Sequence, residues 1–505
     1  MKARDIGFAL VLWGMLIWRW GYAFGTGDHV ELLPYVLFLH NLHLFPHDLF
    51  IQSLHAAQPN ERTIVANLLL PCVNYLPITL FLLHVLSTVL IAVGLKRIAA
   101  LFLNDIMSWL VVFAALVLCY GQQPGNDELY DAAMQASSLS TAFSVWALFF
   151  WIQKRWLTSS LLMIVATYMH VLAGMDVMLA LIAASALQCL TTRDVKWPEL
   201  VRFSLPWLVL AGPYLMAIYL AKTAGNNSVS SGTLFWIQFE FRHPHHFIFR
   251  TFPVMHKILL VVYSIPALYI FSRRNNSLFY FFCTALAALC AYIVAVDFFH
   301  VTFVANFQWY KLMPYLKFLG ILAIVMMCYT PSVARKISSL NSESILNKTS
   351  IIGGLGITLF AVTLWQQNAF SRGFHIDLED EINICERTKN CTDTSAVLVV
   401  PFQFTAMKYF GQRSCYVEFK AIAKNQRDAL HWYNRIHQVY GLNYNEPQSG
   451  FSMEEKANAN LNRLSTLQID SLKTEGVTHI INTHPGLQEN HQLLAKEGPY
   501  YLYKL

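Results

Sequence analysis

Long apolar blocks constrain this chain more than any other feature. From residue 6 to residue 367 the sequence repeats blocks of about twenty apolar residues, separated by short polar stretches. Helices of about twenty residues span the ~30 Å hydrocarbon layer, where only helices and closed barrels satisfy their backbone groups. Composition agrees, because 55% of the residues are hydrophobic and 13% charged, against roughly 25% charged in soluble domains. The sequence therefore predicts a polytopic helical membrane protein.

Basic residues between the blocks predict the orientation of the chain. Lys2 and Arg4 precede the first block, so the positive-inside rule places the N-terminus in the cytoplasm. Further basic pairs separate later blocks: Lys96 with Arg97, Lys154 with Arg155, Arg193 with Lys196, Arg273 with Arg274, and Arg335 with Lys336. We expect eleven spans, at residues 6–24, 75–95, 101–120, 137–153, 157–173, 175–190, 202–221, 257–272, 278–296, 312–330 and 350–367. An odd number of spans places the C-terminus outside.

The basic residues form small clusters between spans and no basic face lined with aromatic side chains. This distribution excludes nucleic acid as the expected partner.

Two apolar segments do not fit a simple span. The run at 64–95 is too long for one crossing and contains Pro71 and Pro77, so we expect a shorter surface helix before the true span. The segment 32–44 is too short to cross and predicts a second surface or re-entrant helix.

After about residue 370 the composition becomes that of a soluble domain. Patterns predict strands at 395–402, 414–419, 477–483 and 500–503, and helices at 426–440 and 453–473. The expected fold is mainly α: a transmembrane domain at 1–369 with long outer loops, followed by a small extracytoplasmic α/β domain at 370–505. The outer loops are 25–63, 121–136, 222–257 and 297–311. Cys385 and Cys391 either close a disulfide loop there or remain thiols, and their spacing fits both.

Acidic residues gather just outside the first span. The stretch GTGDHVELLPYVLFLHNLHLFPHD, residues 25–48, contains Asp28, Glu31 and Asp48, together with His29, His40, His43 and His47. Carboxylates at a membrane boundary are costly to desolvate unless they are solvated, paired or used in chemistry. Asp28 and Glu31 are three residues apart and can share a helix face. They are candidate catalytic acids, and the alternative is that they solvate the end of a helix.

The other outer loops carry further candidate groups. Loop 121–136 contains Asp127, Glu128 and Asp131 and has no basic residue, which is also compatible with a plain solvated loop. Loop 222–257 is cationic and aromatic, with Arg242, Arg250 and histidines at 243, 245, 246 and 256. The histidines suggest a metal site, but Pro244 among them favours an irregular loop and a packing or phosphate-binding role. His170 and Asp176 flank Gly174 at an outer turn, where they could line a cavity or cap a helix.

Together these features resemble the GT-C class of membrane glycosyltransferases, which use polyprenyl-phosphate-linked sugars. The resemblance rests on the eleven spans, the acids after the first span (Asp28, Glu31), the long first outer loop with surface helices, the acids of the second outer loop (Asp127, Glu128), and the C-terminal outer domain. The chain lacks the WWD-type motif of oligosaccharyltransferases. Transfer of whole oligosaccharides to protein asparagine is therefore not expected.

The resemblance implies roles for these acids. The carboxylate of the first outer loop would be the base or would orient the acceptor, which matches Asp28, with Glu31 as its rival. The acids of the second outer loop bind a metal or the acceptor in some members, which matches Asp127 and Glu128. Asp131 and Asp48 are grouped with them, and a divalent cation is a candidate cofactor.

A phosphate leaving group needs positive charge close to it. Four residues are candidates to bind the phosphate of the donor: Arg242, Arg250, Lys311 and His243. Arg is well suited to this role because its guanidinium makes bidentate contacts.

The sequence thus predicts a transferase that moves a sugar from a polyprenyl-phosphate-linked donor to an extracytoplasmic glycan, lipid or protein. Its expected partners are the lipid donor, membrane lipids and that acceptor. The expected location is the bacterial inner membrane, with the C-terminal domain in the periplasm. One alternative is a lipid-linked glycan transporter or flippase, disfavoured because few ionisable residues lie deep in spans, His84 and Asp105 being the nearest, and no repeat is visible. The other is a non-catalytic GT-C-like scaffold of the cell envelope.

Overall fold

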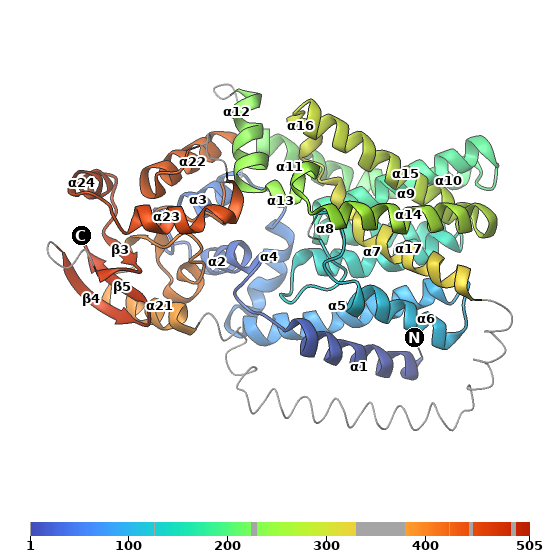
Figure 1. The fold of residues 1–505 in the computed structure, drawn as a ribbon, viewed down its shortest axis with the longest axis horizontal. Coiled ribbons are helices and arrows are strands. Elements are labelled where there is room, and N and C mark those ends of the chain that lie inside the picture. The colour runs from blue at the N-terminus through green and yellow to red at the C-terminus, as the bar shows by residue number, and fades with distance from the viewer. Residues whose placement is uncertain are drawn as a thin grey trace. The chain divides into compact units, whose positions relative to one another are not determined.

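The computed structural model describes residues 2–125, 127–223, 230–329, 379–423, 425–443, 448–485 and 491–505. The chain is mainly helical and contains a five-stranded sheet near its C-terminus (Figure 1). It divides into two compact units. The helical unit comprises Met1–Tyr22, Ile78–Pro213 and His245–Gly373, and the mixed unit comprises Ala23–Pro77, Tyr214–Pro244 and Phe374–Leu505. The mixed unit therefore combines the C-terminal domain with two stretches that the sequence places in outer loops.

Apolar helices build the helical unit. They are α1 (Ala3–Trp20), α5 (Leu76–Ala99), α6 (Asp105–Phe113), α7 (Ala136–Ile152), α8 (Trp156–Met169), α9 (Val171–Thr191), α10 (Trp197–Leu210), α14 (Val254–Arg274), α15 (Asn276–Ile293) and α17 (Met313–Cys328). Most of α11 (Gly212–Thr223), which follows α10, belongs to the mixed unit. Neighbouring helices pack in pairs, α7 with α8, α14 with α17 and α9 with α15. Each of the ten spans predicted before residue 330 coincides with one of these helices or a consecutive pair.

Several helical stretches are long and apolar enough to cross a membrane, as expected of an integral membrane protein. Among the described residues there are five: Thr63–Ala99, Val171–Thr191, Val254–Arg274, Asn276–Phe298 and Thr302–Cys328. A sixth is obtained if α10 and α11, bent by 44°, form one span. Three further apolar helices are shorter, so the number eleven stays a prediction. The last predicted span, 350–367, lies outside the described residues.

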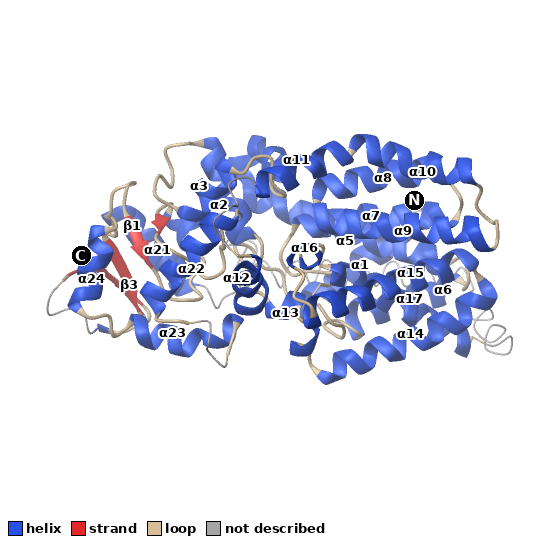
Figure 2. Ribbon diagram, turned by 90° about the horizontal axis from the view of Figure 1, so that it is seen from above, coloured by secondary structure: helices blue, strands red, loops and turns tan. Residues whose placement is uncertain are grey.

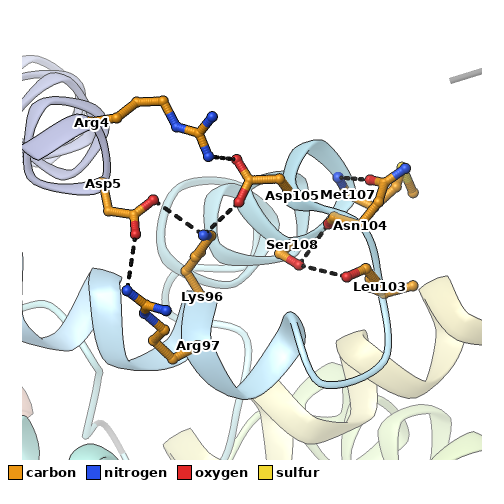
Figure 3. A network of polar contacts seen from close by, with 9 residues as sticks. All are labelled: Arg4, Asp5, Lys96, Arg97, Leu103, Asn104, Asp105, Met107 and Ser108. Atoms are coloured by element: carbon orange, nitrogen blue, oxygen red, sulfur yellow. Dashed lines mark hydrogen bonds and ion pairs between the residues drawn. The ribbon is translucent and has the colours of Figure 1, made fainter. Parts of the chain in front are cut away.

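An ion-pair network ties α1 to α5 and α6 (Figure 3). The Asp5 carboxylate is fully buried and accepts from Lys96 Nζ at 3.1 Å and from Arg97 Nη2 at 3.4 Å. Asp105 lies 2.5 Å from Lys96 Nζ and 2.5 Å from Arg4 Nη2. Asp105 is the first residue of α6, and Arg4 of α1 and Lys96 of α5 balance its charge. The carboxylate therefore connects three helices near their ends.

Short helices follow α1 and precede α5, in the stretch that the sequence predicts as the first outer loop. They are α2 (His29–His40), α3 (Leu49–Ala56) and α4 (Thr63–Leu69), followed by a 3-10 turn at Leu70–Tyr75. Cys72 in this turn has non-helical backbone angles, and Pro71 precedes it. Pro removes a backbone donor and disfavours helix continuation. The predicted break between a short helix and the longer one therefore occurs at this turn.

The sheet of the mixed unit has the order β2-β1-β3-β5-β4. Strands β2 (Ser414–Cys415), β1 (Val397–Val399) and β3 (His479–Asn482) are parallel, whereas β5 (Tyr500–Lys504) and β4 (Gln492–Glu497) add antiparallel pairs. Side chains alternate between the two faces of a strand. Val397, Val399 and Ile480 join one apolar core, and Leu398 and Ile481 join another.

Helices cover both faces of this sheet, as Figure 2 shows for the red strands. The first core includes side chains of α22 (Gln426–Tyr440), α23 (Glu454–Leu461) and α24 (Thr466–Thr474), and the second includes side chains of α21 (Glu379–Cys391). A small α/β arrangement is therefore present, as predicted. The predicted helix 426–440 has the bounds of α22.

Other C-terminal predictions need correction. The single helix expected at 453–473 is two helices, because Ser465 caps α24 with Gln468 as its reciprocal partner and so starts a new helix. The sequence patterns missed α21 and β4. Cys385 and Cys391 both lie on α21 and are free thiols, the first buried and the second exposed. Six residues apart on a helix of about 3.6 residues per turn, they point to different sides.

Candidate functional site

The two candidate catalytic acids share one arginine in the mixed unit. Arg62 Nη2 binds the Glu31 carboxylate in a short ion pair, and Arg62 Nη1 lies 3.8 Å from Asp28 Oδ2. Asp28 is the N-cap residue of α2 and Glu31 lies in its first turn. The predicted shared helix face therefore exists, and it faces a cation. Although burial alone would lower the pKa of Arg62, the charges of Glu31 and Asp28 raise it above its ordinary value.

The two acids differ in access to solvent. The side chain of Glu31 is 8% exposed, whereas that of Asp28 is 34% exposed. Glu31 is therefore the buried counter-ion of Arg62. The Asp28 carboxylate is the more exposed of the two.

Local hydrogen bonds fix the position of Arg62 at the start of α4. Its backbone N–H donates to Asn60 Oδ1 at 2.9 Å, and Asn60 Nδ2 donates to the Leu54 carbonyl at 2.9 Å. The Tyr214 hydroxyl donates to the Asn60 carbonyl at 3.1 Å. Sequence patterns missed Arg62, but one signal was available. It is the single Arg or Lys between residues 21 and 95.

Arg242 and His243, two predicted phosphate ligands, end a π-helical segment, Trp236–Arg242. Arg242 is 2% exposed, donates from Nη2 to the Lys420 carbonyl at 2.7 Å, and stacks over the rings of Phe419 and Phe451. Burial lowers its pKa to about 10, and the charge of Glu31 acts in the opposite direction. The guanidinium thus lies within the electrostatic influence of Glu31 and is enclosed by aromatic rings. His243 Nδ1 lies 3.2 Å from the Gln238 carbonyl.

Asp48 links the first outer loop to the sheet of the mixed unit. Its Oδ1 accepts from Ile51 N at 3.0 Å, which caps α3, and its Oδ2 accepts from Cys415 N at 3.1 Å on the edge strand β2. Lys408 Nζ lies 3.9 Å from Asp48 and 2.5 Å from Glu418. Burial raises the pKa of Glu418 to about 7, although Lys408 opposes the shift. Asp48 is 1% exposed, so the structure places it in a buried polar cluster.

A second acidic cluster lies in the helical unit. Asp127 Oδ1 is 2.5 Å from Lys311 Nζ, and Glu128 Oε2 is 2.5 Å from Lys317 Nζ. Glu128 Oε1 also accepts from Gly121 N at 2.7 Å, and Lys317 donates to the Cys119 carbonyl at 2.9 Å. Burial raises the pKa of Glu128, while Lys317 and the Gly121 N–H act against that rise. Lys311, just before α17, and Lys317, within α17, thus balance the charges of Asp127 and Glu128.

Asp176 adds a carboxylate to this cluster. It lies on α9 and is fully buried, and within the described part of the chain neither of its carboxylate oxygens has a hydrogen-bond partner. Lys311 and Asp127 both lie close enough to act on it electrostatically. The predicted capping role belongs instead to His170, whose Nδ1 accepts from Ala173 N at 3.2 Å.

Asp131 and Arg250 occupy other positions in the helical unit. Asp131 Oδ1 accepts from Ala133 N at 3.0 Å, and its carbonyl lies 2.9 Å from His84 Nε2. Arg250 is exposed, and its backbone N–H donates to Asp297 Oδ1 at 3.0 Å. The Asp297 carboxylate therefore holds the turn that carries the Arg250 side chain.

Potential metal ligands are dispersed over the described residues. Within them, no three His, Cys, Asp or Glu side chains are grouped so that they could hold a metal ion. The rings of His245 and His246 lie 4.3 Å apart, and His246 Nδ1 lies 3.2 Å from the Gly125 carbonyl. The histidines therefore pack against the acidic loop of the helical unit.

Comparison with solved structures returns glycosyltransferases of the GT-C class, the class that the sequence resembles. One is the archaeal oligosaccharyltransferase AglB from Archaeoglobus fulgidus, in complex with an inhibitory peptide and a dolichol-phosphate, at 11% identity and a TM-score of 0.48, covering 95% of this chain and 69% of that one. Another is ArnT from Cupriavidus metallidurans bound to undecaprenyl phosphate, at 11% identity and a TM-score of 0.44, covering 99% and 97%. At these TM-scores the likeness assigns no residue and no activity to this chain.

Sequence comparison identifies a family model to which no function is assigned. Residues 379–439 match the family model of a domain of unknown function, DUF6798. This match covers α21, β1, β2 and most of α22. No curated protein matches the chain.

Proposed function

We propose that the protein is a membrane glycosyltransferase that moves a sugar from a polyprenyl-phosphate-linked donor to an extracytoplasmic acceptor. The observation that carries the proposal is the asymmetric acid pair on Arg62. An accessible carboxylate beside a buried ion pair is an arrangement that suits a general base for an acceptor hydroxyl. The Arg62 guanidinium lies 3.8 Å from the Asp28 carboxylate and is itself paired with Glu31.

In the proposed step Asp28 takes the proton of the acceptor hydroxyl. The acceptor oxygen forms a bond with the anomeric carbon of the sugar, and the bond from that carbon to the phosphate oxygen breaks. The polyprenyl phosphate leaves as an anion, which positive side chains stabilise. Glu31 is a positioning residue, because it acts on Asp28 through Arg62.

The predicted phosphate ligands differ in their suitability. Arg250 is exposed, so its guanidinium is accessible to a phosphate headgroup. Lys311 is paired with Asp127, and Arg242 is enclosed by aromatic rings. We therefore rank Arg250 first and keep Lys311, Arg242 and His243 as further candidates.

For the acids of the helical unit, binding of the acceptor or of a metal stays a prediction from the sequence. Asp127 and Glu128 each have a lysine counter-ion at 2.5 Å, which lowers their need for a metal. The partly exposed Asp127–Lys311 pair offers an acceptor and a donor to a hydroxyl-rich molecule, whereas the Glu128–Lys317 pair is buried. Asp131 stays a candidate for the same role.

The test is the glycan product of cells that express the protein. Asp28→Asn keeps the size of the side chain and removes the base, so we expect surface glycan or glycolipid to fall at least about 100-fold. Glu455→Gln is the matched control, because Glu455 is an exposed acid of the mixed unit on α23, and it should give wild-type product. Wild-type product from Asp28→Asn would overturn the catalytic role.

A lipid-linked glycan flippase is the second candidate, favoured by one observation. Asp176 and Lys317 are fully buried ionisable residues within apolar helices that are long enough to span a membrane, and such residues often mark transport pathways. A flippase would translocate lipid-linked glycan without forming a new glycosidic bond. Asp176→Asn would then abolish translocation, and Asp28→Asn would not.

A further inference from the structure

The mixed unit contains a groove to which nothing above assigns a function. It has a volume of about 710 Å³ and lies between the start of α3 and the sheet. This volume is within the range of about 300–1,000 Å³ that is typical of small-molecule sites. Its walls include His47 and Gln52 from the first outer loop, Ser395 and Thr478 just before β1 and β3, and Arg435 of α22.

The polar groups of the groove are held in place. The Tyr416 hydroxyl lies 2.7 Å from Gln438 Oε1 and contacts the Glu475 carboxylate, and Gln438 Nε2 donates to Glu475 Oε1 at 2.8 Å. Arg435 stacks over the Tyr416 ring at 4.3 Å and donates from Nη1 to the Tyr416 carbonyl at 2.8 Å. Tyr416 is buried, so these contacts form a rigid floor beneath exposed hydroxyl and amide groups.

Charge balance favours a neutral ligand. Arg435 and Glu475 contribute opposite charges to the same wall, and the Asp48 carboxylate, which also borders the groove, is buried beside Lys408. Thr474, Glu475 and Gly476 mark the C-terminal end of α24, where the helix dipole carries partial negative charge. This end disfavours an anion such as phosphate, and Arg435 disfavours a cation.

Strand addition by a peptide is blocked at the adjacent sheet edge. β2 is the edge strand, and its outward N–H at Cys415 is already bonded to Asp48. A peptide that adds a strand needs such a free donor. The remaining chemistry, several hydroxyl and amide groups beside Arg435 and Glu475, suits a molecule that carries many hydroxyls.

We propose that this groove binds a neutral oligosaccharide segment. Its use as the acceptor glycan rests on the glycosyl transfer proposed above, whereas the binding itself does not. The segment would lie along α3 and the start of the sheet, with its hydroxyls bonded to Arg435, Glu475 and the Thr and Ser side chains of the rim.

Calorimetry on the full-length protein in detergent tests the proposal. The probes are maltotriose and chitotriose as neutral oligosaccharides, and trigalacturonic acid as an anionic one. We expect a neutral probe to bind with a Kd of about 1 mM or tighter and more tightly than the anion. Failure of both neutral probes to bind, or tighter binding of the anion, would overturn the proposal.

Substitutions of groove residues test whether the oligosaccharide binds in this groove. Arg435→Gln removes a charged wall group, and Ser395→Trp fills the groove at an exposed position, so each should weaken binding at least about tenfold. Arg387→Gln is the matched control, because Arg387 forms an exposed pair with Glu497 away from the groove, and its affinity should equal wild type. Wild-type affinity in Ser395→Trp and Arg435→Gln, with melting temperatures unchanged, would overturn the proposal.

Asp28→Asn separates the two proposals. It should retain oligosaccharide binding while it loses glycan transfer. If Asp28→Asn retains transfer and Arg435→Gln loses binding, the proposed chemistry fails and the groove stands. If Asp28→Asn loses the binding that Arg435→Gln retains, the groove proposal fails.

Discussion

Arg62 and Glu31 form a buried ion pair across 31 positions of the first outer loop. The pair joins the start of α4 to the first turn of α2 and places Asp28 at the second nitrogen of the same guanidinium. Glu31 is therefore the buried acid of the two, and Asp28 is the partly exposed one.

Removal of Arg62 should unfold this part of the chain or weaken it strongly. Arg62→Gln leaves the Glu31 carboxylate buried without a counter-ion, which costs about 3–5 kcal/mol and lowers the melting temperature of the purified protein. The exposed pair of Arg387 with Glu497 is the comparison, because Arg387→Gln should cost only about 0–1 kcal/mol. Equal melting temperatures for the two variants would show that the Arg62 pair does not hold the loop.

Sequence patterns correctly predicted the elements whose hydrophobic residues follow a clear pattern. The apolar blocks before residue 330 coincide with helices, of which five or six among the described residues are long enough to cross a membrane. The amphipathic pattern of 426–440 gave the bounds of α22. The same patterns did not identify contacts between residues that lie far apart in the sequence. Arg62 and Lys408 are isolated basic residues whose acidic partners, Glu31 and Glu418, are identified only in the folded chain. Strand β4, with the sequence QLLAKE, lies at the sheet edge and lacks an alternating pattern.

Stability should fall as the pH rises from about 4.5 to 7 because of Glu381. Burial raises the pKa of Glu381 to about 7, although N–H and hydroxyl groups at Thr405 and Tyr500 oppose the shift. The folded protein therefore holds a proton that the unfolded chain has lost, and this contribution is present below pH 4.5 and lost as the pH passes 7. The rise of the pKa from 4.5 to about 7 amounts to about 3–4 kcal/mol, at about 1.4 kcal/mol per pKa unit.

The measurement is the melting temperature of Glu381→Gln and wild type at pH 5 and pH 8. The difference between the two proteins should change with pH. In Glu386→Gln, which alters an exposed acid of the same helix, the difference from wild type should be the same at both pH values. A pH-independent difference for Glu381→Gln would contradict the buried-acid explanation.

Asp48 should stabilise more than an ordinary helix cap. Asp48→Ala removes the acceptor for the N–H groups of Ile51 and Cys415 and a counter-ion near Lys408, so we expect a loss of about 2–4 kcal/mol. Ser465→Ala removes a cap alone, from α24, and should cost about 1 kcal/mol. Denaturant unfolding measures both, and a loss for Asp48→Ala no larger than for Ser465→Ala would contradict the link to β2.

Gly125 should be needed for the pairing of Asp127 with Lys311. It has φ of +99°, and an added Cβ would lie 2.5 Å from Tyr310 Cβ, directly before Lys311. Gly121 has φ of +71° and open space around it. Both substitutions to Ala incur backbone strain, but only Gly125→Ala adds overlap, worth about 1–3 kcal/mol. Thermal unfolding should show Gly125→Ala as the less stable variant, and the reverse order would contradict this packing.

The most direct measurement is the release of polyprenyl phosphate by the purified protein. A panel of radiolabelled polyprenyl-phosphate-linked sugars is incubated with the protein and an extracytoplasmic membrane extract as the acceptor source. We predict release by wild type and by Glu455→Gln, a loss of at least about 100-fold in Asp28→Asn, and a smaller loss in Glu31→Gln, because that residue acts through Arg62. Release by Asp28→Asn at the wild-type rate would contradict the account.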